Sequence, residues 1–226
     1  MKRFYKDVTV RDGAILLDGR AVKTQARAPL AIPFPALAEA IAAEWRAQGD
    51  AIDPRSMPMT GLSNAAIDLV APDPEAFARP LALYAETDLL CYRAESPPEL
   101  IVEEAAAWDP LLDWARGRYD VHLVTTSGIV HTAQPPATIA RLGEALAARS
   151  SFALAAMAPL VTIGGSLIAA LAIAEGHIAP ETAFEATHLD EMWQARMWGE
   201  DALATATRET HRRDFLSAAR LLTLAR

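Results

Sequence analysis

Cysteine is almost absent from this chain of 226 residues, in which Cys91 is the only one. A single cysteine cannot form a disulfide within the chain, and such usage is typical of a reducing, intracellular compartment. The first residues also lack the apolar run of a secretory signal peptide and are too acidic for a transit peptide. Cys91 follows Leu90 and precedes Tyr92, where an inert, packed thiol is much commoner than a nucleophile.

Basic residues are in the minority, because 21 Lys and Arg stand against 29 Asp and Glu, for a net charge of -8. A nucleic-acid-binding protein presents a basic face to phosphates, so this balance argues against that class. A hydrophobic content of 52% excludes a disordered chain. The length allows one large domain or two small ones.

One stretch without charge, residues 150–174, is as long as a membrane span. Pro159 and the pair Gly164-Gly165 interrupt it, and it is rich in Ala, Ser and Thr. We therefore expect a short helix that ends before Pro159, a buried helix over Ser166–Ala174, and no stable insertion into a membrane.

The common catalytic signatures are also missing. The chain has no His-Glu-x-x-His, Gly-x-Ser-x-Gly, phosphate-loop or dinucleotide-binding motif. His188 and Glu191 could supply two metal ligands, but no third ligand lies at a recognisable spacing. We therefore expect neither a metal nor a cofactor.

Strand signals fill the beginning of the chain. Asp12-Gly13 and Asp18-Gly19 are typical of hairpin turns, and they separate short apolar segments. These segments are 4–10, 14–17 and 21–24. Helices are expected over Pro35–Gln48, which carries Trp45 on or beside its buried stripe, and over 61–69 and 74–85.

Helical spacing dominates after the linker-like segment Ser96-Pro97-Pro98. We expect Asp109 to cap a new helical segment that begins at Pro110, and a hairpin over Val121–Thr132. Further helices are expected over 136–148, 180–198 and 201–226. The sequence therefore predicts an α+β protein with a β-rich N-terminal domain over residues 1–95 and a helical domain over residues 96–226.

The helix expected over 180–198 carries the best candidate site. Phe184, Glu191 and Trp198 are seven residues apart, which places a carboxylate between two aromatic rings on one helix face. This carboxylate could anchor an Arg or a backbone amide of a partner protein. It could equally be a structural Glu paired with His188 or an Arg, since a polar group on an apolar face needs a partner in either case.

Tryptophans with neighbouring acids also resemble a contact surface more than usual. Asp201 could cap the last helix, although its carboxylate also belongs to an acidic cluster. The candidate partner-binding residues are Glu191, Trp198, Glu200, Asp201, Trp193, Phe184 and Trp45.

An ordered set of short motifs covers nearly the whole chain. The motifs include Arg3-Phe4-Tyr5-Lys6, Ala43-Glu44-Trp45, Thr87-Asp88-Leu89-Leu90-Cys91-Tyr92-Arg93, Trp108-Asp109-Pro110, Leu189-Asp190-Glu191 and Trp198-Gly199-Glu200-Asp201. Each is weak alone, but together they resemble the assembly chaperones of the F1 ATP synthase alpha subunit.

The resemblance implies a chaperone without enzymatic activity, which binds the free alpha subunit, prevents its aggregation and promotes assembly of the F1 hexamer. It also implies a small β-rich N-terminal domain, a larger helical domain, and a conserved acid at Glu191 or in Glu200-Asp201. The bacterial cytoplasm is the expected location, or the mitochondrial matrix for eukaryotic relatives. The alternative is a hydrolase that uses Glu191, His188 and a second acid, and it requires these groups to meet in one cleft.

Overall fold

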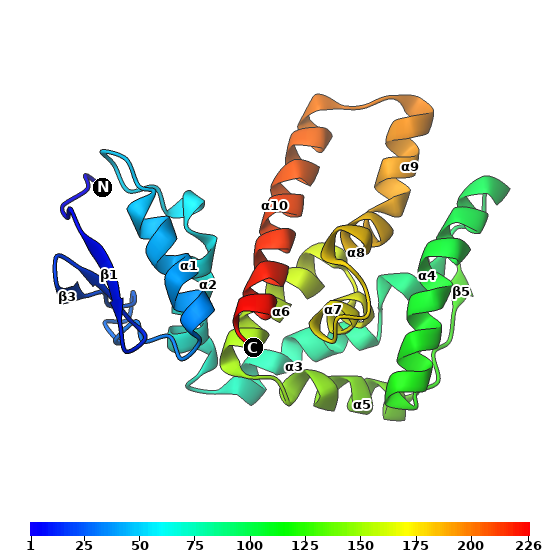
Figure 1. Cartoon of the computed structure of the whole chain (residues 1–226). Helices are drawn as coiled ribbons and strands as arrows, with labels where there is room; N and C mark the ends of the chain where they lie inside the picture. Colours follow the sequence, from blue (N-terminus) through cyan, green and yellow to red (C-terminus); the bar gives the residue numbers. More distant parts are fainter. The chain divides into compact units, whose positions relative to one another are not determined.

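The computed structural model describes all 226 residues, which form two compact units (Figure 1). The first unit contains residues 1–77, 150–156 and 217–226, and the second contains residues 78–149 and 157–216. The predicted α+β class is confirmed, because a small sheet comes first and helices follow it. The predicted domain boundary between residues 95 and 96 stays a prediction.

An antiparallel sheet opens the first unit, with strands β1 (Val8–Arg11), β2 (Ala14–Leu17) and β3 (Arg20–Ala21) in that order. Both predicted turns are present, since Val8 pairs with Leu17 across the first hairpin and Leu17 with Arg20 across the second. Gly13 has a φ of +77°, and a Cβ there would lie 2.4 Å from the carbonyl oxygen of Ile32. Only glycine fits this turn.

Helix α1 (Pro35–Arg46) packs on β1 and β2, with Leu37 and Ile41 fully buried. It ends two residues before the predicted end at Gln48. The carboxylate of Glu44 accepts hydrogen bonds from the backbone N–H groups of Met59 and Thr60 and thereby holds the start of α2. This unit also contains the 3-10 turn η1 (Pro54–Ser56), α2 (Pro58–Ala65) and the π-helical turn η2 (Ala66–Val70).

Helices form nearly all of the second unit. Its complete elements are η3 (Leu83–Ala85), η4 (Leu89–Cys91), β4 (Tyr92–Arg93), α4 (Pro98–Tyr119), β5 (Thr126–Ser127), α5 (Pro136–Ala147), α7 (Leu167–Ala174), α8 (Pro180–Thr187) and α9 (Leu189–Trp198). Three further helices contribute residues to both units: α3 (Pro74–Ala82), α6 (Ser151–Gly164) and α10 (Ala202–Leu224).

Helix α7 is the centre of this unit and begins where the sequence predicts. The hydroxyl of Ser166 accepts the N–H of Ala169 at 3.0 Å, and the buried carboxylate of Asp88 accepts the N–H of Ile168 at 3.0 Å. Burial raises the pKa of Asp88 to about 6. Each helix of the structure is either too short or not apolar enough to cross a membrane.

Two predictions about proline were wrong. α4 continues through Pro110 and α6 continues through Pro159, so neither proline ends or begins a helix. Pro110 has no N–H for the carbonyl of Ala106, but both residues are exposed, so water can serve that carbonyl. Tertiary packing along the rest of a long helix then outweighs the loss of one hydrogen bond.

The predicted hairpin over Val121–Thr132 was also wrong. β5 pairs in parallel with β4, so Thr126 lies opposite Tyr92 instead of a neighbour in sequence. The side chain of Gln134 accepts the N–H of Val124 at 3.0 Å and donates to its carbonyl at 2.7 Å. These contacts satisfy backbone groups that a hairpin would otherwise pair.

Candidate functional site

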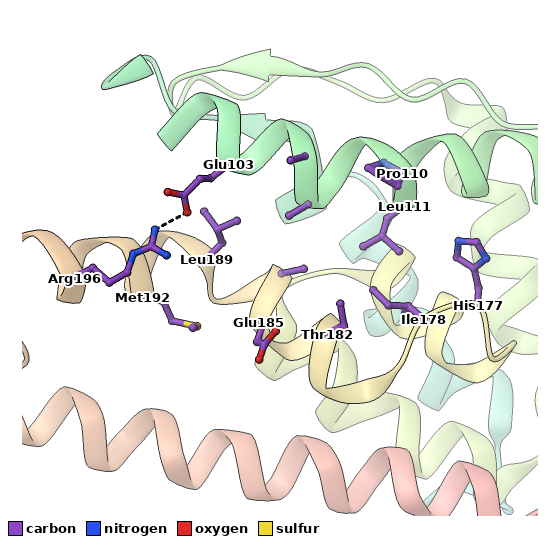
Figure 2. A pocket seen from close by; sticks show the side chains of 13 residues that line it. Glu103, Pro110, Leu111, His177, Ile178, Thr182, Glu185, Leu189, Met192 and Arg196 are labelled. Carbon is purple, nitrogen blue, oxygen red and sulfur yellow. Dashed lines mark hydrogen bonds and ion pairs between the residues drawn. The ribbon is translucent and has the colours of Figure 1, made fainter. Parts of the chain in front are cut away.

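An open, mostly apolar groove of about 510 Å³ lies in the second unit between α4 and the pair α8–α9 (Figure 2). Small or apolar side chains line it on both sides: Ala106, Ala107, Pro110 and Leu111 from α4, and Ile178, Thr182, Ala186, Leu189 and Met192 opposite. An ion pair between Glu103 and Arg196 crosses one end of the groove.

Helical spacing places the α4 wall of the groove on one face. Glu103, Ala106, Ala107, Pro110 and Leu111 follow each other at i, i+3, i+4, i+7 and i+8. The alanines leave room because their side chains end at Cβ.

The opposite wall is fixed to α4 by a buried tryptophan. The indole N–H of Trp108 donates to the carbonyl of Ala186 at 2.7 Å, and Trp108 is 1% exposed. The guanidinium of Arg93 lies 5.0 Å from the centre of the Trp108 ring. The groove is therefore built into the packing of this unit and needs no rearrangement to open.

The helix predicted over 180–198 is broken, which corrects the predicted face. α8 ends at Thr187 and α9 begins at Leu189, with His188 between them at φ −113° and ψ 17°. Phe184 therefore does not share one helix face with Glu191 and Trp198. It lies in the core at 2% exposure, with His188 stacked on it at 3.9 Å.

Glu191 forms an ion pair with Arg208 of α10, with 3.1 Å between Oε1 and the guanidinium nitrogen. The same guanidinium lies 3.5 Å from the carboxylate of Glu200. The Arg208 side chain is 12% exposed, whereas that of Glu191 is 43% exposed. Two carboxylates therefore share one cation, and one negative charge is left over at the surface.

Large apolar side chains are exposed where α9 meets α10. Met197, Trp198 and Leu203 are 59%, 75% and 77% exposed, and we call these three residues with Glu200 and Asp201 the α9–α10 tip (Figure 1, orange). Trp193, by contrast, is 6% exposed and meets the Trp198 ring edge-on at 5.7 Å. Asp201 accepts the N–H of Ala204 at 2.8 Å, so the predicted cap of the last helix is confirmed.

A pair of carboxyl groups joins α4 to α9, and sequence reasoning missed it. Glu104 is fully buried and accepts the N–H of Ala94, while the buried Oδ1 of Asp190 has no N–H donor. Burial raises the pKa of both groups, because neither carboxylate is well solvated beside the other. A proton held by one of the two carboxyl groups would supply the donor that Oδ1 of Asp190 lacks. The two residues are far apart in sequence, so only the fold brings them together.

Trp45 belongs to the first unit and not to this groove. Its ring is half-buried and meets the Tyr5 ring edge-on at 5.6 Å. Its indole N–H is buried and has no acceptor.

The hydrolase alternative required Glu191, His188 and a second acid in one cleft, and the structure does not bring them together in this way. Neither Glu191 nor His188 lines the groove. The imidazole of His188 is buried, and its Nδ1 lies 3.0 Å from the carbonyl oxygen of Phe184. Burial lowers the pKa of His188.

Comparison with known proteins decides the family. A family model described as the ATP12 chaperone protein matches residues 2–116. The chain belongs to the ATP12 chaperone family. Family members are assembly factors of the F1 ATP synthase, so the expected role as a chaperone of ATP synthase assembly is confirmed.

Solved structures agree along the whole chain. Atp12 from Paracoccus denitrificans, and a variant of it with one aspartate replaced by lysine, are 39% identical to this chain with a TM-score of 0.94. The match covers 100% of this chain and 98% of each of those chains. The Atu1473 protein of Agrobacterium tumefaciens, described as a candidate chaperone, is also 39% identical, with 86% of its chain covered and a TM-score of 0.94.

Proposed function

We propose that this protein binds the unassembled alpha subunit of the F1 ATP synthase, prevents its aggregation and promotes assembly of the F1 hexamer. Membership of the ATP12 chaperone family supports the assembly role. The observation that carries the binding role is the apolar groove beside an exposed aromatic tip, both in the second unit. The protein then acts by binding and not by catalysis.

The groove suits an apolar segment of a client. A subunit without its neighbours exposes an apolar patch that would otherwise drive aggregation. Small side chains such as Ala106 and Ala107 allow close approach, and the flexible Met192 can adapt to different client side chains. Because the groove is preformed, little ordering entropy is lost when it is filled.

The tip suits a contact that combines an apolar centre with a charged rim. An exposed Trp198 is a typical hot-spot residue, since its ring buries a large area at low conformational cost. The surplus negative charge of Glu191 and Glu200 beside Arg208 favours a basic client residue at the rim. Glu191 and Trp45 remain predicted partner-binding residues in this proposal. Phe184 and Trp193, which were also predicted to bind the partner, are buried, so they would contribute by supporting the fold of α8 and α9. The cytoplasmic location stays a prediction.

Light scattering of the isolated alpha subunit tests the proposal. We expect the purified protein to suppress aggregation at stoichiometric amounts without ATP. The double variant Trp198→Ser/Leu203→Ser should lose most of this effect at an unchanged melting temperature. Val102→Ser is the matched control, because Val102 is 68% exposed but lies outside the groove and the tip. Absence of suppression by the unmodified protein at excess would refute the proposal.

A further inference from the structure

A trough runs across the first unit, which contains neither the groove nor the tip. Its largest hollow, of about 570 Å³, is lined by Phe4, Tyr5, Val22, Lys23 and Trp45, among others. A second hollow, of about 350 Å³, shares Val22, Lys23 and Trp45 with the first. The two hollows therefore adjoin, and their common wall is apolar and aromatic with one lysine.

Three cations line the largest hollow, although the chain as a whole is acidic. Arg20, Lys23 and Arg27 are exposed, and none of them forms a salt bridge. The one acid of this hollow, Asp18, already accepts the N–H groups of Lys6 and Asp7 at 3.0 and 2.8 Å. These hydrogen bonds lower the pKa of Asp18. Asp18 also interacts electrostatically with Arg20. Lys23 and Arg27 therefore carry the positive charge that no acid of this hollow balances.

The loop that carries two of these cations is held rigidly. The carboxylate of Asp68 accepts the hydroxyl of Thr24 at 2.6 Å and the N–H of Ala26 at 2.9 Å. The Thr24 hydroxyl also accepts the N–H of Ala28 at 3.1 Å. Lys23 and Arg27 are therefore presented in a fixed arrangement, which reduces the entropy lost on binding.

Arg27 occupies an unfavourable backbone conformation. Its φ of +71° lies in the left-handed region, where Gly or Asn would cost less than Arg. Loop geometry alone would thus favour a smaller residue at this position. Arg27 lines the hollow, and its guanidinium is the feature that a smaller residue would lack.

We propose that this trough binds an extended, acidic segment of a partner protein. Carboxylates of the segment would meet Arg20, Lys23 and Arg27, and apolar side chains between them would lie on Phe4, Val22 and Trp45. A protein segment with a few carboxylates fits better than a nucleic acid, because only three cations line the hollow, whereas a nucleic acid carries a negative charge on every nucleotide. The inference concerns the first unit and does not depend on the identity of the client.

Fluorescence anisotropy with the full chain tests this binding. The probe is a labelled twelve-residue peptide of Asp, Glu and Leu, and its control replaces each acid by the corresponding amide. We expect saturable binding of the acidic peptide and at least tenfold weaker binding of the amide peptide. Failure of the acidic peptide to saturate, or equal affinity of the two peptides, would overturn the proposal. Tighter binding of a labelled single-stranded oligonucleotide would overturn it as well, in favour of a general polyanion site.

Two variants in the trough and one control outside it locate the binding. Lys23→Glu/Arg27→Glu should weaken binding of the acidic peptide at least tenfold. The control, Arg11→Glu/Arg55→Glu, makes the same charge change on exposed residues outside the trough, and it should change the affinity less than threefold. Arg27→Gly should weaken binding without lowering the melting temperature, because it removes both the cation and the backbone strain. An equal loss in both double variants, or no loss with Arg27→Gly, would contradict the proposal.

Discussion

Aromatic residues have opposite surroundings at the two ends of the α8–α10 region. We call Phe184, His188 and Phe215 the base of this region, and its other end is the α9–α10 tip. At the base, Phe184 is 2% exposed and lies between the His188 ring and the Phe215 ring, 5.5 Å away. At the tip, Trp198 is 75% exposed. Both aromatics are spaced seven residues from Glu191, so their spacing gives no hint of this difference. The break at His188 produces it, because the chain changes direction between the two rings.

This difference separates stability from binding. Removal of a buried ring leaves a cavity that the surrounding core cannot fill, whereas removal of an exposed ring takes little from the folded state. An exposed aromatic ring gains its free energy only when a partner covers it. Variants at the base should therefore act on folding, and variants at the tip should act on the client complex.

The largest effect is expected at the base. Phe184→Ala should lower the free energy of unfolding by about 3–5 kcal/mol, because the ring is fully packed. Trp198→Ala should lower it by less than about 1 kcal/mol. Urea denaturation followed by circular dichroism measures both values. Similar losses in the two variants would show that the base and the tip do not differ in this way.

For affinity toward the client, the large effect is expected at the tip. Trp198→Ala should raise the Kd for the isolated alpha subunit at least tenfold, or about 1.4 kcal/mol or more. Val102→Ser on α4 should leave it unchanged, since that side chain is exposed outside the proposed surface. Surface plasmon resonance with immobilised alpha subunit measures both. An unchanged Kd for Trp198→Ala would remove the tip from the proposed interface.

Sequence reasoning succeeded where local chemistry decides the structure. The Asp-Gly turns, the cap at Asp201 and the start of α7 at Ser166 each depend on side-chain and backbone groups within a few residues. The predicted helix break at Pro110 was wrong. The free-energy cost of a proline inside a helix can be read from the local sequence, but the tertiary packing that outweighs this cost involves residues far away in the sequence.

The candidate site depended on distant pairs and could be predicted only in part. Glu191, Trp198 and the acids near them were named, but the sharing of Arg208 by Glu191 and Glu200 is set by the packing of α10. The groove needs α4 opposite α8 and α9, and the Glu104–Asp190 pair needs the same arrangement. Periodicity indicates which face of a helix is apolar, but not which helix lies against it.

A smaller effect on the free energy of unfolding, which depends on pH, is expected from the Glu104–Asp190 pair between α4 and α9. The folded pair Glu104–Asp190 keeps its proton above the pH at which the unfolded carboxyls lose theirs, because its pKa is raised. The folded state then binds more protons, so the free energy of unfolding falls as pH rises through the range above the ordinary carboxyl pKa.

Glu104→Gln should remove this dependence. The amide can still accept the N–H of Ala94 and can donate to Asp190 without a titrating proton. We expect a gain of about 1–2 kcal/mol in the free energy of unfolding near pH 7 and a flatter curve between pH 4 and 7. Glu103→Gln is the control, because Glu103 is surface-exposed and paired with Arg196. Identical pH curves for Glu104→Gln and the unmodified protein would exclude the shared proton.

The smallest effect separates the two roles of Asp201, as the cap of α10 and as a surface charge. Asp201→Ala should lower the free energy of unfolding by about 1 kcal/mol, because the N–H of Ala204 loses its capping acceptor. Asp201→Asn keeps an acceptor at the same place and removes only the charge, so its stability should stay within about 0.5 kcal/mol of the unmodified protein. If Asp201→Asn nevertheless weakens the client complex while Asp201→Ala weakens it no further, the charge acts on the partner and the cap acts on the fold. If only Asp201→Ala weakens the complex, the tip contributes its shape at this position, and the negative charge that a client meets must come from Glu191 and Glu200.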